Sequence, residues 1–269
     1  MKEFYAFLVK IGINPIAFYK FALGLPSFVK DYSKFKRALI DKSEFPFSTF
    51  YPIMMDKTTN SGKMHGAYFH QDLLVARMIH QNKPVKHVDI GSRIDGFVAH
   101  VAVFREIEVF DIRKQTSKVK NIIFKQADFM QLPAELTEYC DSVSSLHALE
   151  HFGLGRYGDP IDPYGHIKGI ESIYKMLKPG GTFYFSVPMG KQRIEFNAHR
   201  VFDVKYLIKI LESMFITESF NYVDDNGDLI EDVVLQEDKI IENYGVYYGC
   251  AIFKLKKRKV HSDTTYDSK

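Results

Sequence analysis

The chain has 269 residues, a formal net charge of +3 at pH 7 and an apolar fraction of 46%. This apolar fraction is ample for a packed core and excludes a chain that is disordered throughout. The charge is too small to indicate a nucleic-acid-binding protein, so nucleic acid is not an expected partner.

Residues 1–42 are rich in aromatic and basic side chains and predict two or three short amphipathic helices. Apolar residues recur at helical spacing in two groups, Phe4, Phe7, Leu8 and Ile11, and then Phe28, Tyr32, Phe35 and Leu39. Pro15 and Pro26 are expected to break the helices. Two interpretations stay open: the helices pack onto the main domain, or they contact a membrane surface or a lipid-linked substrate, as interfacial helices with interleaved aromatic and lysine residues do.

A loop-rich stretch at 43–69 leads to a helix predicted over residues 70–81. Residues 1–82 are therefore expected to form an N-terminal helical extension, and residues 83–255 the main domain. Residues 256–269 show no apolar periodicity and are expected to form a flexible basic tail.

Short apolar runs alternate with helical stretches throughout the main domain. The expected strands lie at 86–90, 107–110, 121–124, 141–146, 181–187, 215–222 and 246–254, and the expected helices at 96–104, 165–177 and 203–213. This alternation predicts an α/β fold with a doubly wound, mostly parallel, seven-stranded Rossmann-like sheet. Only a loop separates the last two strands, so they are expected to pair antiparallel at the edge.

The end of the first expected strand has the features of a nucleotide-binding turn. Ligands of open α/β sheets bind at the carboxyl ends of the strands, where backbone and ligand approach closely. Gly91 permits such an approach, and Gly96 is expected to open the next helix with its amides facing the ligand. Asp89, just before this turn, is a further candidate ligand contact.

Acidic residues follow the next two expected strands. Asp111 ends the second strand, where a carboxylate can accept hydrogen bonds from both ribose hydroxyls of a nucleoside. After the third strand, Asp128 can accept from an adenine amino group and Phe129 can offer its ring to the base. The set indicates an adenosine-containing ligand.

The strings Leu149-Glu150-His151 and Leu177-Lys178-Pro179-Gly180-Gly181 complete an ordered series over residues 85–255. This series resembles class I methyltransferases that use S-adenosyl-L-methionine (SAM). The resemblance implies SAM as the cofactor, with Asp89 and Gly91 near its methionine end, Asp111 at the ribose and Asp128 at the adenine. Ser145 is included in the expected cofactor-binding set.

Arg93 stands where the resembled family has a glycine, and Gly96 comes one position later than the family's last glycine. The Arg93 guanidinium is expected to pair with the SAM carboxylate, since the two groups match bidentately. The alternative is a catalytically inactive SAM-fold binding or scaffold protein. A nicotinamide-dependent oxidoreductase would need a Gly-x-Gly-x-x-Gly turn, which residues 91–96 do not supply.

At finer grain, four strings resemble a bacterial group known as domain of unknown function 268. They lie at residues 68–73, 87–100, 146–160 and 195–202. The resemblance implies a methyltransferase of polysaccharide biosynthesis, with a sugar or glycan as its partner and substrate, free or nucleotide- or lipid-linked.

Methyl transfer to a hydroxyl requires alignment of donor and acceptor and a base for the hydroxyl proton. His147 and His151 follow the fourth strand, and His199 lies in the loop after the fifth. These three are the candidate catalytic residues. His147 is preferred because it is nearest the strand end.

Two loops are expected to bind the acceptor. The glycine-rich segment 152–165 is interpreted as a lid in which Arg156, Tyr157 and Asp159 contact a sugar. In the segment after the fifth strand, Arg193 and Arg200 are expected to meet an acidic group. No recognised metal-ligand spacing is present, so no metal is expected.

The sequence thus predicts a SAM-dependent O-methyltransferase acting on a sugar hydroxyl of a surface glycan or its precursor. Cys140 and Cys250 are expected to be buried thiols in a reducing compartment. With no signal peptide or membrane-spanning run apparent, the expected location is cytoplasmic, including the inner face of the membrane.

Overall fold

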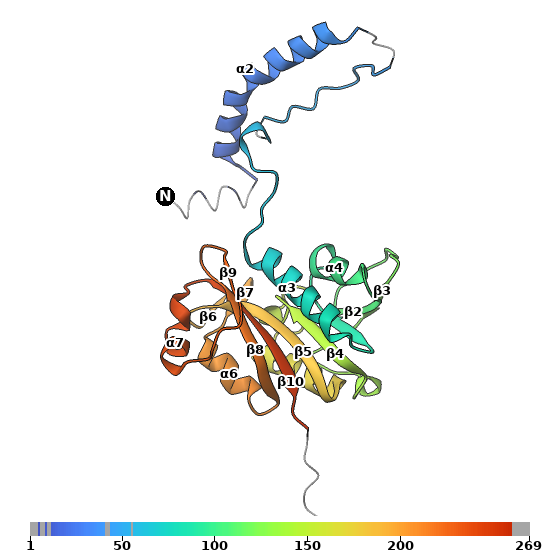
Figure 1. Ribbon diagram of the computed structural model, residues 1–269, viewed down its shortest axis with the longest axis vertical. Helices are drawn as coiled ribbons and strands as arrows, with labels where there is room; N and C mark the ends of the chain where they lie inside the picture. The colour runs from blue at the N-terminus through green and yellow to red at the C-terminus, as the bar shows by residue number, and fades with distance from the viewer. Residues whose placement is uncertain (1–4, 6–8, 10–11, 41–43, 55, 260–269) are drawn as a thin grey trace, which may run out of the picture. The chain divides into compact units, whose positions relative to one another are not determined.

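The computed structural model describes residues 5, 9, 12–40, 44–54 and 56–259. It divides into a first unit, Met1–Lys63, and a second, Met64–Lys269 (Figure 1). The helix expected around Phe4, Phe7, Leu8 and Ile11 lies outside the described residues, as does the tail from residue 260.

Among its described residues, the first unit contains a long helix, α2 (Pro15–Ala38), and a short 3-10 turn, η1 (Asp56–Thr58). The Asn14 side chain caps the helix by accepting from the Ala17 amide at 3.0 Å. The predicted break at Pro26 is wrong, because α2 continues through it. Beyond the proline, aromatic packing supports the helix: the ring of Tyr32 lies 5.4 Å from that of Phe47.

No helix among the described residues is both long and apolar enough to span a bilayer. Contact of the N-terminal residues with a membrane surface stays a prediction.

The second unit is built on an eight-stranded sheet in the order β3–β2–β1–β4–β5–β10–β8–β9 (Figure 1). Its strands are β1 (His87–Ile90), β2 (Ile107–Asp111), β3 (Ile122–Gln126), β4 (Cys140–Leu146), β5 (Leu177–Met189), β8 (Phe215–Val223), β9 (Leu229–Ile230) and β10 (Gly249–Lys257). The first five strands in that order are parallel, and β10, β8 and β9 pair antiparallel. The expected mostly parallel, doubly wound sheet is confirmed, with the two-residue β9 added to the seven expected strands.

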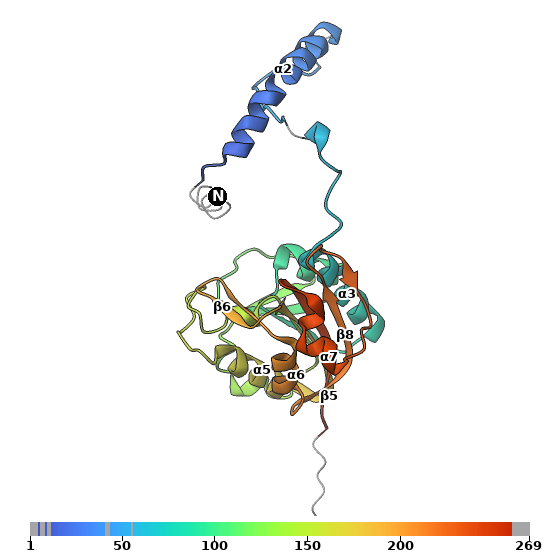
Figure 2. The same cartoon turned by 90° about the vertical axis from the view of Figure 1, so that its left-hand side faces the viewer.

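Helices cover both faces of the sheet (Figure 2). The remaining elements are α3 (Ala67–Asn82), η2 (Ile94–Val98), α4 (Ala99–Ala102), η3 (Ala134–Leu136), η4 (Leu149–His151), α5 (Gly165–Met176), β6 (Arg193–Glu195), β7 (His199–Val201), α6 (Val204–Leu211), α7 (Glu237–Ile241) and η5 (Asn243–Gly245). One core cluster joins α5 and α6 to the sheet, and a second joins α3, η2 and α4 to it. Because both faces are covered, a strand such as β1 is buried at every residue.

Two expected boundaries move. Helix α3 belongs to the second unit, which begins at Met64, because its apolar side chains Leu74, Val75 and Ile79 are part of the second core cluster. At the other end, β10 continues to Lys257, which is buried and donates to the Leu177 carbonyl at 2.5 Å. The strand therefore takes in two residues that were expected in the tail.

Candidate active site

A cavity of about 330 Å³ opens where β1, β2, β4 and β5 end, the edge at which such sheets bind ligands. The expected site residues that line it are Gly91, Arg93, Asp111, Asp128, Phe129, His147, His151, Arg156, Tyr157, Asp159 and His199. Asp89, Gly96, Ser145, Arg193 and Arg200 do not line it.

The turn after β1 forms the floor of the cavity at Gly91. This residue has a φ of 72°, and a Cβ there would lie 3.0 Å from the Ala148 Cβ on the segment after β4. Both observations favour glycine. Gly91 lines the cavity, and its amide donates to the Phe110 carbonyl at 2.9 Å.

Asp111 lies at the end of β2 and is already paired. Its Oδ2 accepts from Nη2 of Arg113 at 2.6 Å, and its Oδ1 accepts from Nε of Arg113 at 3.0 Å. The Arg113 guanidinium also lies 4.3 Å from the centre of the Tyr157 ring. The Arg113 amide also donates to Oδ1, at 2.8 Å. A carboxylate has about four acceptor positions, so Asp111 keeps capacity for a ribose hydroxyl beside Arg113. Arg113 was not predicted from the sequence.

Asp128 and Phe129 form the cavity wall after β3. Oδ1 of Asp128 accepts from the Met130 amide at 2.8 Å, which fixes the turn. Phe129 is buried, and its ring packs edge-on against Phe110 at 5.2 Å. This wall presents one carboxylate and two aromatic rings, a combination suited to a purine base.

Asp89 and Ser145 support this region from below. Asp89 is fully buried and accepts from the Ser92 amide at 3.0 Å, the Ser92 hydroxyl at 2.6 Å and the Ser144 hydroxyl at 2.5 Å. Burial raises the pKa of Asp89 to about 7. The Ser145 hydroxyl donates to the Ile90 carbonyl at 2.9 Å. Neither side chain reaches the cavity, so both brace the Gly91 turn instead of contacting a ligand.

The segment after this turn is a π-helix, in which the Val98 amide bonds the Arg93 carbonyl at 3.3 Å. A π-turn takes one residue more than an α-turn, which accommodates the late position of Gly96. A Cβ on Gly96 would lie 2.6 Å from Oδ2 of Asp72. Gly96 therefore makes room for Asp72 and does not face a ligand.

Arg93 lines the cavity, but its guanidinium is paired. It bonds both carboxylate oxygens of Asp95, at 3.1 Å and 3.0 Å, and lies 5.2 Å from the centre of the Tyr68 ring. More than half of the Arg93 side chain is exposed. The arginine thus lies at the rim and leaves the cavity open.

The three histidines line the cavity from the segments after β4 and β5. Nδ1 of His147 lies 2.8 Å from Oε1 of Gln71, and Nδ1 of His151 donates to the Ala198 carbonyl at 2.7 Å. Nε2 of His199 lies 3.2 Å from the Tyr248 hydroxyl. Burial lowers the pKa of His147 to about 3 and that of His151 to about 4, and also lowers the pKa of His199. All three are therefore neutral near pH 7.

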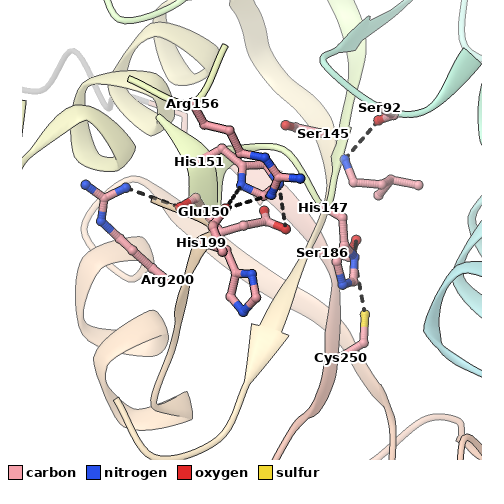
Figure 3. Close-up of polar contacts among 12 residues, drawn as sticks. Ser92, Ser145, His147, Glu150, His151, Arg156, Ser186, His199, Arg200 and Cys250 are labelled. Carbon is pink, nitrogen blue, oxygen red and sulfur yellow. Dashed lines mark hydrogen bonds and ion pairs between the residues drawn. The ribbon is translucent and has the colours of Figure 1, made fainter. Parts of the chain in front are cut away.

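Glu150 is a functional candidate that the sequence analysis did not single out for a role. It lines the cavity, yet its side chain is 1% exposed, and its Oε2 has no hydrogen-bond partner among the described residues. Its Oε1 lies 3.7 Å from Nε2 of His151 (Figure 3). Burial raises the pKa of Glu150 to about 8, so near pH 7 it is a carboxylic acid that can donate a hydrogen bond.

The Glu150→Gln variant is expected to become more stable than the parent as the pH rises. The folded-state pKa of Glu150 lies above its usual value of 4.5, so its contribution to stability is lost as pH rises towards about 8. Glutamine stays neutral. The difference in unfolding free energy should therefore grow by more than about 1 kcal/mol between roughly pH 5 and pH 8. Urea unfolding of both proteins across this range measures it, and a constant difference would contradict a buried neutral acid.

The loop expected to be a lid is held by its own side chains. The Asp159 carboxylate accepts from the amides of Gly153 at 2.7 Å, Gly155 at 3.2 Å and Tyr157 at 3.2 Å. Asp159 lines the cavity, but these contacts make it a brace of the loop. Arg156 also lines the cavity and donates to the Ala198 carbonyl at 2.8 Å.

The two later arginines do not reach the cavity. Arg200 is buried and donates to the carbonyls of Phe152 at 2.6 Å and Pro163 at 3.2 Å. It also donates to the Glu150 carbonyl at 3.3 Å (Figure 3). Arg193 pairs with Glu195 at 2.9 Å. The prediction that Arg200 binds an acidic group is wrong, because its guanidinium donates to backbone carbonyls instead.

No group of three or more potential metal ligands lies together within the described residues.

Solved structures of similar fold include 1,6-didemethyltoxoflavin-N1-methyltransferase from Burkholderia thailandensis, bound to 1,6-didemethyltoxoflavin and S-adenosylhomocysteine. It shares 14% identity, covers 70% of this chain and 79% of that chain, and has a TM-score of 0.51. N-methyltransferase NodS from Bradyrhizobium japonicum WM9, in complex with S-adenosylhomocysteine, shares 14% identity over 84% of this chain and 97% of that chain, with a TM-score of 0.48. At these identities the likeness is one of fold.

No curated protein matches the chain. Residues 97–244, more than half of the sequence, match the family described as "Caenorhabditis protein of unknown function, DUF268". The family is named for Caenorhabditis, so the expectation of a specifically bacterial group is not supported. The chain belongs to the DUF268 family and has the doubly wound fold of a methyltransferase.

Proposed function

We propose that the chain is a SAM-dependent methyltransferase that methylates a hydroxyl of a sugar, in a surface glycan or its nucleotide- or lipid-linked precursor. The observation that carries this proposal is one cavity lined by two chemically different sets of side chains. One set is Asp111, Asp128 and Phe129, and the other is three neutral histidines.

The cavity residues fit both parts of the cofactor. Asp111 would accept from a ribose hydroxyl, and Phe129 and Asp128 would face the adenine. The backbone at Gly91 would lie along the methionine part. When bound, SAM supplies an electrophilic methyl carbon attached to sulfur.

One of the histidines would supply the base. With SAM bound, the acceptor oxygen would bond to the methyl carbon as the bond from that carbon to sulfur breaks, and the hydroxyl proton would pass to a histidine nitrogen. Neutral imidazoles suit this step because a protonated one has no free lone pair. Glu150, as a neutral acid, can donate a hydrogen bond to a substrate oxygen.

Calorimetric titration with SAM and with S-adenosylhomocysteine tests the cofactor. Binding of both supports the proposal, while binding of neither favours an inactive protein of the same fold. A methylation assay over nucleotide-linked and lipid-linked sugars, read by mass spectrometry, then tests the acceptor. A product methylated on nitrogen or carbon would overturn the assignment to a hydroxyl.

The Asp111→Ala variant is expected to bind SAM more weakly by about 1–3 kcal/mol, since it loses a charged acceptor for the ribose hydroxyls. By calorimetry this is a decrease in affinity of roughly 5- to 150-fold. Glu135→Ala is the control, because Glu135 is exposed and does not line the cavity. Equal affinities for the two variants would remove Asp111 from the cofactor site.

A further inference from the structure

Two buried polar side chains of α3, Gln71 and Asp72, form a hydrogen-bonded series that ends at His147. Gln71 is 1% exposed and Asp72 is 5% exposed, although both carry polar side chains. Both precede residues 97–244, the part of the chain that matches the family. Burial of two adjacent polar side chains is costly unless they are bonded, so their partners indicate what they do.

The orientation of the Gln71 amide follows from its neighbours. Its Nε2 donates to Oδ1 of Asp72 at 3.1 Å, which turns its Oε1 towards His147. The same Oε1 accepts from the Ser186 hydroxyl at 2.6 Å. An amide oxygen can only accept hydrogen bonds, so Nδ1 of His147, at 2.8 Å from it, must carry the proton.

The position of this proton decides the chemistry of the other ring nitrogen. With the proton on Nδ1, neutral His147 has a lone pair on Nε2. Nε2 of His147 makes no hydrogen bond to any residue in the described part of the chain, and His147 lines the cavity. The other histidines differ: Nε2 of His199 is engaged by the Tyr248 hydroxyl, and Nε2 of His151 faces the Glu150 carboxyl group.

We infer that Gln71, oriented by Asp72, is a positioning residue that holds His147 in the tautomer with a free Nε2, and that this nitrogen takes the acceptor proton. The second part rests on the proposed function. In the step, the hydroxyl proton would move to Nε2 of His147 as the acceptor oxygen bonds to the methyl carbon and the bond from that carbon to sulfur breaks. His147 would become an imidazolium whose Nδ1–H stays hydrogen-bonded to the Gln71 oxygen. The neutral amide orients the ring without adding a charge behind it.

¹⁵N NMR of histidine-labelled protein tests the first part without SAM or an acceptor. The nitrogen shifts of a neutral imidazole identify the protonated nitrogen, and His147→Ala assigns the signals. The parent protein is expected to show His147 protonated on Nδ1. Gln71→Met is expected to shift the tautomer towards Nε2 protonation, and Gln71→Glu to restore Nδ1 protonation because a carboxylate also accepts.

Ser186→Ala is the matched control, since it removes the hydroxyl donor to Gln71 Oε1 and leaves the bond to His147 and the weak one from the Cys250 thiol, at 3.7 Å, in place. A parent protein with His147 protonated on Nε2 would overturn the inference. So would an unchanged tautomer in a folded Gln71→Met variant. If that variant fails to fold, the spectra of the parent protein and of Gln71→Glu still show which nitrogen of His147 is protonated.

Kinetics tests the second part once an acceptor is found. Gln71→Met is expected to lower kcat by up to the roughly 10²- to 10⁴-fold that a general base contributes, with unchanged SAM affinity, and Gln71→Glu to recover part of the loss. Equal kcat in the parent and Gln71→Met would overturn the role in proton transfer. Failure of the proposed function itself would appear separately, as absence of SAM binding in the parent protein.

Discussion

Replacement of Arg200 by methionine is expected to lower the free energy of unfolding by about 3 kcal/mol or more. Arg200 is 4% exposed, and its guanidinium donates to the carbonyls of Glu150, Phe152, Asp162 and Pro163, at 3.3, 2.6, 3.5 and 3.2 Å. Methionine keeps much of the volume but removes this donor from all four carbonyls, of which the Asp162 carbonyl still accepts from the Gly165 amide at 3.0 Å. Each buried carbonyl that stays unpaired costs about 1–3 kcal/mol, and partial access of water reduces the sum.

Urea unfolding measures this effect, with Arg193→Met as the matched control. Arg193 lies on the same β6–β7 hairpin, but its partners are the exposed Glu195 and the Lys191 carbonyl. Substitutions at such sites change stability by about 0.5 kcal/mol or less. Similar losses in both variants would contradict a special role for the buried guanidinium.

The His147→Ala variant is expected to lower turnover by about 10²- to 10⁴-fold, because it removes the base nearest the end of β4. SAM affinity should be almost unchanged, since the cofactor contacts lie with Asp111 and Asp128. Steady-state kinetics together with calorimetry separates the two effects.

His80→Ala is a suitable control, because His80 is exposed on α3 and does not line the cavity. A much larger loss for His199→Ala or His151→Ala than for His147→Ala would move the base to that histidine. The same experiment therefore ranks all three candidates.

The sheet and its cavity edge could be predicted because they depend on patterns that are local in sequence. A fully covered parallel strand such as β1 or β4 is a short apolar run between turns, and a run of this kind is visible without any tertiary information. The carboxyl ends of these strands meet at one edge. Asp111, Asp128 and His147 were therefore expected together, and all line the same cavity.

The role of each polar side chain at this edge was harder to predict. Asp89 and Asp111 both lie near the ends of strands. Asp89 accepts hydrogen bonds from Ser92 and Ser144, whereas Asp111 lines the cavity. Arginine is a residue type that often binds acidic ligands, but Arg200 donates instead to backbone carbonyls far from it in sequence. Such distinctions depend on long-range packing, which spacing along the chain does not encode.

Residues from distant elements were missed for the same reason. Gln71 and Tyr68 come from a helix before the first strand, and Tyr248 comes from the segment before the last strand. Only the fold brings them to the cavity. The nearest available signal was the pair of adjacent polar residues Gln71 and Asp72 within an otherwise apolar helical pattern.

Helix α3 precedes the first strand in the chain, which has a practical consequence for any attempt to isolate a minimal domain. A shortened chain that begins at Lys83 would retain every strand of the sheet and the whole family match. It would lose Tyr68 from the cavity wall and Gln71 from behind His147, and it would expose the core side chains that Leu74 and Ile79 cover. Such a fragment is expected to be poorly soluble and inactive, so the smallest working unit should begin before Met64.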